Sequence, residues 1–175
     1  MNKENTEHPK VLKHIIEERH SIFPKDYTGA AVPEEIISEV LNAAVLAPSH
    51  KRTRPWRFRV FKGDDRLELG RELQRIYKET TPEFQFLRKK YDDFMFKVTQ
   101  AGAIISIVVE YSGLVPEWEE VAAVAMAVEN MYLTGTASNI GCYWGSPGLV
   151  KHMGDFLKLE ENQQSLGFFY MGILE

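Results

Sequence analysis

The chain has 175 residues, enough to bury one hydrophobic core, and we expect a single domain over residues 1–175. Apolar residues make up 44% and charged residues 26%, an ordinary globular composition that argues against disorder. The formal net charge of −4 argues against a general affinity for nucleic acid or anionic membranes. Cys142 is the only cysteine, which excludes an intramolecular disulfide and a cysteine-rich metal site.

The N-terminal segment, residues 1–10, reads MNKENTEHPK and is expected to be flexible. It is polar and lacks the apolar core of a secretory signal. The apolar runs further along are interrupted by charge or glycine before they reach the length that spans a bilayer. Together with the lone cysteine, which suits a reducing compartment, these features predict a soluble, cytoplasmic protein.

The first half of the chain alternates between helical and extended patterns. Apolar residues recur at helical spacing in three segments, the second of which starts at Pro33 and is stopped by Pro48, and a charged helix is expected after the turn at Gly63-Asp64-Asp65. The segment WRFRVF alternates apolar with basic side chains, which is typical of a strand with one solvated face. The expected elements are helices over residues 11–19, 33–47, 66–78 and 82–98 and a strand over residues 56–61.

The second half contains the most apolar segments. AIISIVVE, residues 103–110, is a continuous β-branched run that suits a strand buried on both faces. Residues 117–138 form the longest expected helix, which is apolar most of the way round and should lie in a core or a subunit interface. A short strand at GCYW, a short helix over 148–157 and a final strand over 165–174 follow. Because the order has no regular βαβ rhythm, we predict an α+β fold with a central sheet.

Several standard catalytic signatures are missing from the sequence. It contains no GxGxxG, Walker A, GxSxG or HExxH motif. The five histidines show no metal-ligand spacing, and the cysteine has no nearby histidine in sequence. We therefore predict neither a metal site nor a covalent nucleophile.

Three polar clusters remain, each at the edge of an apolar element. They are RHS at 19–21, APSHKRTRPW at 47–56 and YWGSPG at 143–148. Taken singly, each has an ordinary explanation: cations at a helix C-terminus, a solvated loop and a strand-ending turn. Nucleic-acid binding is a poor alternative for the cationic loop, because aromatic residues are not interleaved through it.

In this order, the clusters resemble the nitroreductase family of FMN-dependent oxidoreductases. The family has R-[RH]-S at the end of its first helix, then A-P-S-x-x-N-x-Q-P-W, a long Ala-rich helix, G-[IL]-G-x-x-W and a final strand. The resemblance extends from about Val11 to Leu174. It is strongest to the small single-domain branch typified by A-P-D-H-K-x-x-Q-P-W and W-R-S.

The resemblance implies a mostly antiparallel sheet flanked by helices, with FMN bound at a homodimer interface. The long helix over 117–138 would then form the dimer core. NADH or NADPH would pass a hydride through FMN to a small acceptor such as a nitroaromatic or quinone, in a ping-pong scheme. No side chain of the protein would be catalytic, since the flavin carries the chemistry.

The resemblance also implies which residues contact FMN. The first cluster would hold the phosphate, ribityl chain or ring edge, and the third would line the flavin from the C-terminal half. The residues carried over are Arg19, His20, Ser21, Pro48, Ser49, His50, Arg52, Trp144, Gly145 and Ser146.

Four departures from the family pattern concern the same site. Arg52 and Arg54 stand where the family usually has Asn and Gln, and Phe23 stands where larger members have a basic residue. The chain ends at Glu175, where many relatives continue into a tail with basic residues near the phosphate. We expect Lys51 or Arg52 to replace that charge.

Two other classes of function remain open from the sequence. One is a flavin-binding carrier or sensor without reductase turnover. The other is a non-enzymatic interaction module whose cationic loop meets an acidic partner.

Overall fold

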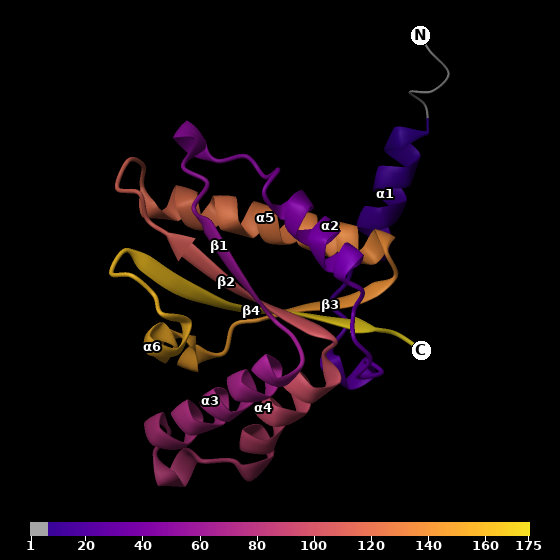
Figure 1. The fold of residues 1–175 in the computed structure, drawn as a ribbon. Coiled ribbons are helices and arrows are strands. Elements are labelled where there is room, and N and C mark those ends of the chain that lie inside the picture. Colours follow the sequence, from indigo (N-terminus) through magenta and orange to yellow (C-terminus); the bar gives the residue numbers. More distant parts are fainter. Residues whose placement is uncertain (1–6) are drawn as a thin grey trace.

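The computed structural model describes residues 7–175 (Figure 1). Short 3-10 turns cover Pro24–Asp26, His50–Arg52, Glu83–Gln85 and Gly148–His152. The helices and strands are α1 (His8–Glu18), α2 (Glu34–Ala44), β1 (Trp56–Phe61), α3 (Asp64–Thr80), α4 (Arg88–Gln100), β2 (Ala103–Glu110), α5 (Glu117–Ala137), β3 (Ile140–Gly145), α6 (Gly154–Leu157) and β4 (Gln163–Ile173).

The four strands form one antiparallel sheet in the order β1-β2-β4-β3. Helices α2 and α5 cover one face, and α3, α4 and α6 lie against the other (Figure 1). Strand β2 is central and buried on both faces, which explains why its sequence is apolar without alternation. The predicted α+β fold with a mostly antiparallel sheet flanked by helices is confirmed.

Each face of the sheet carries its own hydrophobic core. Adjacent residues of β4 show the division: Phe169 packs toward α5, and Phe168 packs toward α3 and α6. Ile105 and Ile104 divide in the same way on β2. Burying each phenylalanine stabilises the fold by about 2–3 kcal/mol, so neighbouring side chains tie both helical layers to one sheet.

Two predicted helices differ from the structure. The helix expected over 82–98 breaks into a 3-10 turn and α4, because the Leu87 N–H donates to the Tyr77 hydroxyl at 3.0 Å. Phe86 also leaves helical geometry, and its ring packs 5.3 Å from that of Tyr77. The helix expected over 148–157 is a 3-10 turn followed by the single turn of α6. In both segments local contacts with other elements override helix propensity.

Helix α5 is the longest in the described chain, as expected, but only one side of it is buried within the protomer. Ala127, Val128 and Met131 are fully covered, whereas Trp118 is 69% exposed and Met126 is 41% exposed. The all-round apolarity of the sequence therefore leaves an apolar face uncovered on this helix. Its neighbour α1 has no buried residue at all.

The predicted flexible segment, residues 1–10, lies partly outside the described residues, which begin at Glu7. Helix α1 begins at His8 within that segment. None of the helices within residues 7–175 has the length and apolarity needed to cross a membrane.

The segment that follows α1 is anchored on the edge strand β3. The Ile22 N–H donates to the Cys142 carbonyl at 2.9 Å, and the Tyr27 hydroxyl donates to the Ile22 carbonyl at 2.7 Å. The Tyr27 ring lies over Gly141 and Gly172, which face each other across β3 and β4. The missing side chains at these glycines make room for the ring, and the ring holds residues 22–27 in place.

Replacing Gly172 with alanine is expected to lower the free energy of unfolding by about 1–3 kcal/mol, because the new methyl group overlaps the Tyr27 ring. Urea denaturation of the variant measures the change. Gly154→Ala is the matched control, since a methyl group there meets nothing within 4 Å. Equal stabilities of the two variants would contradict the conclusion that the Tyr27 ring needs the space left by Gly172.

Candidate functional site

Apart from His20, the predicted site residues lie in or next to two groups at opposite ends of α5. The first is the Tyr132 group, which we define as Arg19, Ser21, Tyr132 and Trp144. The second is the His50 loop, defined as residues 48–54. Figure 1 shows α1 near the C-terminal end of α5 and the His50–Arg52 turn near its N-terminal end.

Tyr132 is the centre of the first group. Its hydroxyl accepts a hydrogen bond from the Trp144 backbone N–H at 2.6 Å and lies 3.3 Å from the Ser21 hydroxyl. The side chain is 7% exposed and its ring packs edge-on to Phe169 at 4.9 Å. One buried hydroxyl therefore joins α5, the segment after α1 and the edge strand β3.

Arg19 covers the same tyrosine. Its guanidinium carbon lies 5.5 Å from the Tyr132 ring centroid, within the range of a cation–π contact. Its Nε lies 3.6 Å from Glu129 Oε1, a long pair to a half-exposed carboxylate. An ion pair of this kind is weak, so the guanidinium keeps donors available for an incoming anion.

Trp144 is fixed by two bonds, because its indole N–H also donates to the Leu166 carbonyl at 3.0 Å. Gly167 permits this arrangement: its φ of +116° favours glycine, and a side chain there would collide with the Gly145 carbonyl. Gly145 and Ser146 open onto a cavity of about 250 Å³ bounded by Tyr143 and α4. The predicted residues 144–146 thus lie at the rim of a hollow.

His20 points away from this group. Its Nδ1 lies 2.7 Å from the Glu18 carbonyl, and its ring lines a different cavity, of about 390 Å³, with Thr136 and Asn139. The structure therefore brings Arg19 and Ser21 together at Tyr132 and leaves His20 outside that contact.

The His50 loop has an unusual backbone. Lys51, Arg52 and Arg54 have φ values of 50°, 56° and 47°, in the left-handed region that non-glycine residues rarely occupy. Such geometry costs roughly 1–3 kcal/mol at each residue and is frequent at functional sites. Two of these three residues, Arg52 and Arg54, stand where the sequence departs from the family pattern.

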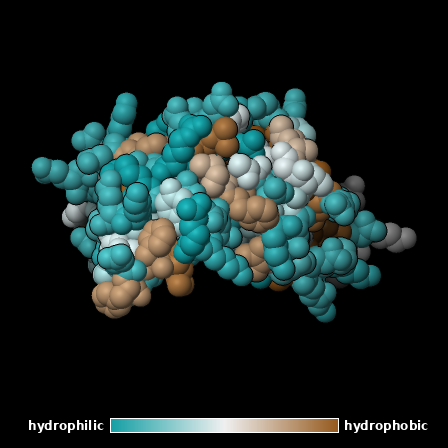
Figure 2. Space-filling model, turned by 90° about the horizontal axis from the view of Figure 1, so that it is seen from below, coloured by the Kyte–Doolittle hydropathy of each residue, from teal (hydrophilic) through white to brown (hydrophobic). Residues whose placement is uncertain are grey.

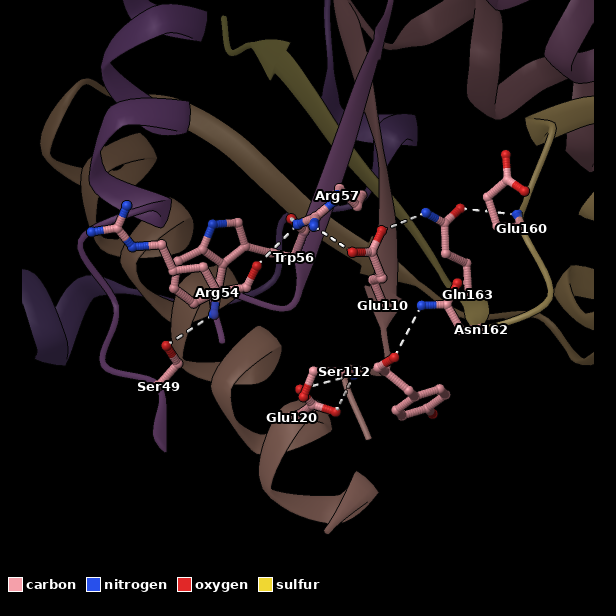
Figure 3. A network of polar contacts seen from close by, with 11 residues as sticks. Ser49, Arg54, Trp56, Arg57, Glu110, Ser112, Glu120, Glu160, Asn162 and Gln163 are labelled. Atoms are coloured by element: carbon pink, nitrogen blue, oxygen red, sulfur yellow. Dashed lines mark hydrogen bonds and ion pairs between the residues drawn. The ribbon is translucent and has the colours of Figure 1, made fainter. Parts of the chain in front are cut away.

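Side-chain contacts hold the loop in this shape. His50 Nδ1 lies 2.5 Å from Glu119 Oε2, and Lys51 Nζ donates to the Leu114 carbonyl at 3.0 Å. The Ser49 hydroxyl accepts from the Arg54 N–H at 3.1 Å, as Figure 3 shows. Ser49 therefore serves its own loop, whereas His50 is oriented by α5.

The arginines of this region differ in how they are held. Arg57 donates to the Arg54 carbonyl at 2.9 Å and to Glu110 at 2.6 Å (Figure 3), so it belongs to the sheet surface. Within residues 7–175 the guanidinium groups of Arg52 and Arg54 make no hydrogen bond or ion pair. Arg52 and Arg54, which stand where the family usually has Asn and Gln, are therefore the unpaired cations of the described loop.

An apolar hollow lies beside the loop. It has a volume of about 380 Å³ and is bounded by Pro48, Ser49, His50 and the exposed side of α5, including Trp118 and Met126. A planar apolar ligand in this hollow would meet the hydrophobic side chains of Trp118 and Met126 as well as the His50 imidazole and the Glu119 carboxylate.

The two groups do not meet within one protomer. Glu119, which holds His50, and Tyr132 are thirteen positions apart on α5, which at 1.5 Å per residue is about 20 Å. Within one protomer the predicted residues thus form two separate groups.

The lone cysteine, Cys142, is buried in the core. Burial raises the pKa of the Cys142 thiol to about 12, so the thiol stays protonated at neutral pH and is a poor nucleophile. Among residues 7–175 no group of three or more His, Cys, Asp or Glu side chains is placed to hold a metal ion.

Two residues that organise the site were not predicted from the sequence. Both Tyr132 and Glu119 lie in α5. From the sequence alone, the periodic position of Tyr132 indicates core packing, and the polarity of Glu119 indicates the helix surface. Only the tertiary contacts to Trp144 and His50 reveal their roles.

The model of the nitroreductase family matches residues 16–173. The chain belongs to the nitroreductase family. Membership confirms the resemblance inferred from the three polar clusters, which all lie within the matched range.

Individual relatives agree with this assignment. YdjA of Escherichia coli (strain K12), assigned by name to the NAD(P)H nitroreductases, is 27% identical over 142 residues, which cover 79% of this chain and 75% of YdjA. The crystal structure of a nitroreductase-like family protein from Bacillus cereus has a TM-score of 0.80 at 24% identity, covering 94% of this chain and 86% of that one. The FMN-dependent nitroreductase NfnB from Mycobacterium smegmatis, solved in complex with NADPH, has a TM-score of 0.77 at 17% identity, covering 95% and 89%. These structures share the fold of the nitroreductase family.

Replacing Tyr132 with phenylalanine is expected to lower the free energy of unfolding by about 1–2 kcal/mol, because the Trp144 N–H loses its acceptor. Chemical denaturation measures the effect. Tyr111→Phe is the control, since its hydroxyl bonds only the exposed Gln164 and its loss should cost less than about 0.5 kcal/mol. Indistinguishable variants would show that the Tyr132 hydroxyl does not hold the group together.

Proposed function

We propose that the chain is an FMN-dependent oxidoreductase that passes a hydride from NADH or NADPH to a small acceptor such as a nitroaromatic or quinone. The observation that carries the proposal is the Tyr132 group. It presents a guanidinium and a hydroxyl at the positions where the family resemblance locates FMN contacts. The relatives' names, which include an FMN-dependent enzyme solved with NADPH, support the same cofactor and donor.

The residues present fit a flavin mononucleotide chemically. Arg19 offers several N–H donors to a phosphate or a pyrimidine edge, and the exposed Ser21 hydroxyl adds another polar contact. The hollow at Gly145 and Ser146 and the apolar hollow at Trp118 both supply surfaces for a planar ring. FMN would supply the redox chemistry, and the chain would bind and orient it.

We further propose that the active form is a homodimer with two composite sites. The Tyr132 group of one protomer and the His50 loop of its partner would form each site. The exposed apolar face of α5 and the exposed Val11, Leu12 and Ile16 of α1 favour this arrangement, since they need an apolar cover. A two-fold axis across α5 would bring the opposite ends of the two helices together.

The cationic loop then faces the bound cofactor. Lys51 already donates to the Leu114 carbonyl, so Arg52 is the better candidate to supply a cation to the FMN phosphate. In the proposed reaction the hydride donor leaves before the nitroaromatic or quinone acceptor binds, which is a ping-pong order. The proposed location is the cytoplasm.

The two alternatives differ from the proposal in one observable each. A carrier or sensor would purify yellow but would not be bleached rapidly by NADH or NADPH without oxygen. An interaction module would be colourless and would gain no flavin absorption when FMN is added. The proposed enzyme is expected to hold FMN, and NADH or NADPH should bleach the flavin rapidly in the absence of oxygen.

Arg19→Ala is expected to weaken FMN binding roughly tenfold to a hundredfold, the usual cost of losing a charge-assisted contact. Fluorescence titration of the apoprotein with FMN measures the dissociation constant. Arg88→Ala removes the same charge from an exposed α4 pair with Asp92 and should leave FMN binding unchanged. Unchanged affinity in Arg19→Ala would remove Arg19 from the cofactor site.

A further inference from the structure

A groove runs between α4 and the segment 143–152. Lys90, Phe94 and Lys97 recur at i, i+4 and i+7, so they share one face of α4 and form one wall. Two hollows of about 250 Å³ each lie along this groove and adjoin at Pro147, which lines both. The near hollow begins at Trp144, Gly145 and Ser146, the residues proposed to line the flavin.

The groove is cationic in a protein of net charge −4. Lys97 lines the near hollow, and Lys90, Lys151 and His152 line the far one. No aspartate or glutamate in residues 7–175 lines either hollow. The face that carries α3 and α4, seen from below in Figure 2, is largely hydrophilic with separate apolar patches.

The two ends of the groove differ in how far their charge is already neutralised. Lys97 is paired with Asp93 at 2.7 Å. Lys90 lies over the Tyr77 ring at 5.2 Å, and within the described chain neither it nor Lys151 or His152 has a carboxylate partner. The far end therefore carries the larger uncompensated positive charge, next to the Thr80 and Thr81 side chains.

We infer that this groove binds the ADP-ribose part of the hydride donor. The far hollow would receive the additional 2′-phosphate that distinguishes NADPH from NADH. The inference rests on the proposed function, because it takes the flavin-lining residues 144–146 as the starting point. A dinucleotide leaving those residues along the groove meets the neutralised Lys97 first and the unpaired cations afterwards. Lys90 and Lys151 are thus specificity-determining residues that favour the phosphorylated donor.

The experiment compares steady-state kinetics with NADPH and NADH in the wild type and in the double variant Lys90→Gln/Lys151→Gln. The wild type should have the higher kcat/KM with NADPH. In the double variant the KM for NADPH should rise about tenfold and that for NADH by less than about twofold. FMN content and Tm should not change.

The control is Lys78→Gln/Lys89→Gln, which removes the same charge from exposed positions of α3 and α4 outside the groove. A wild type that does not discriminate between the donors would overturn the inference. So would a double variant that keeps the wild-type preference, or a control variant that loses it to the same extent.

A protein that binds no FMN would refute the proposed function and leave the groove to be tested directly. Calorimetric titration with 2′-phospho-ADP-ribose and with ADP-ribose makes that test. Tighter binding of the phosphorylated compound, lost in Lys90→Gln/Lys151→Gln, would support the groove. Equal binding of the two compounds, or none, would overturn it.

Discussion

The hydroxyl of Tyr132 is the interaction on which the candidate site depends. It lies on the long helix, accepts from the backbone of the edge strand at Trp144 and contacts Ser21 in the segment after α1. A buried N–H without an acceptor costs about 1–3 kcal/mol. The contact therefore helps to hold these three elements in fixed positions relative to one another. Arg19 is then positioned over the ring, and residues 144–146 reach the rim of their hollow.

The length of α5 imposes the second constraint. Helix geometry separates the residues around Tyr132 from the His50 loop by about 20 Å, and no rearrangement of loops within one protomer closes that distance. The same helix leaves Trp118 and Met126 exposed beside His50. In the proposed homodimer, a second copy of the chain would cover this apolar face and bring its own residues to each composite site.

The sequence predicted the fold well where the spacing of apolar residues indicates which side chains are buried. The β-branched run of β2, the alternation of β1 and the Ala-rich α5 all appear where their periodicity locates them. The sequence failed where a single tertiary contact decides the backbone: the Tyr77 hydroxyl ends the helix expected over 82–98, and no local signal announces it. The strained backbone of Lys51, Arg52 and Arg54 has the same origin, since contacts to Leu114 and Glu119 hold it.

The candidate site was predictable only in part for a related reason. Family motifs mark the residues at 19–21, 48–52 and 144–146, because each motif is a short continuous stretch. They do not show that His20 lines a different cavity from Arg19, nor that Tyr132 and Glu119 organise the two halves. Those roles come from pairs of residues distant in sequence, which only the packed structure brings together.

The composite site can be tested by mixing two defective protomers. Arg19→Ala and His50→Ala, each with its own affinity tag, are co-expressed, and the mixed dimer is purified through both tags. If each site combines Arg19 of one protomer with His50 of its partner, one of the two sites is intact, and the mixed dimer should hold about half the wild-type FMN. If each site lies within one protomer, every site carries a defect, and the mixed dimer would hold no more FMN than the single variants. That result, or the failure of any mixed dimer to form, would contradict the account.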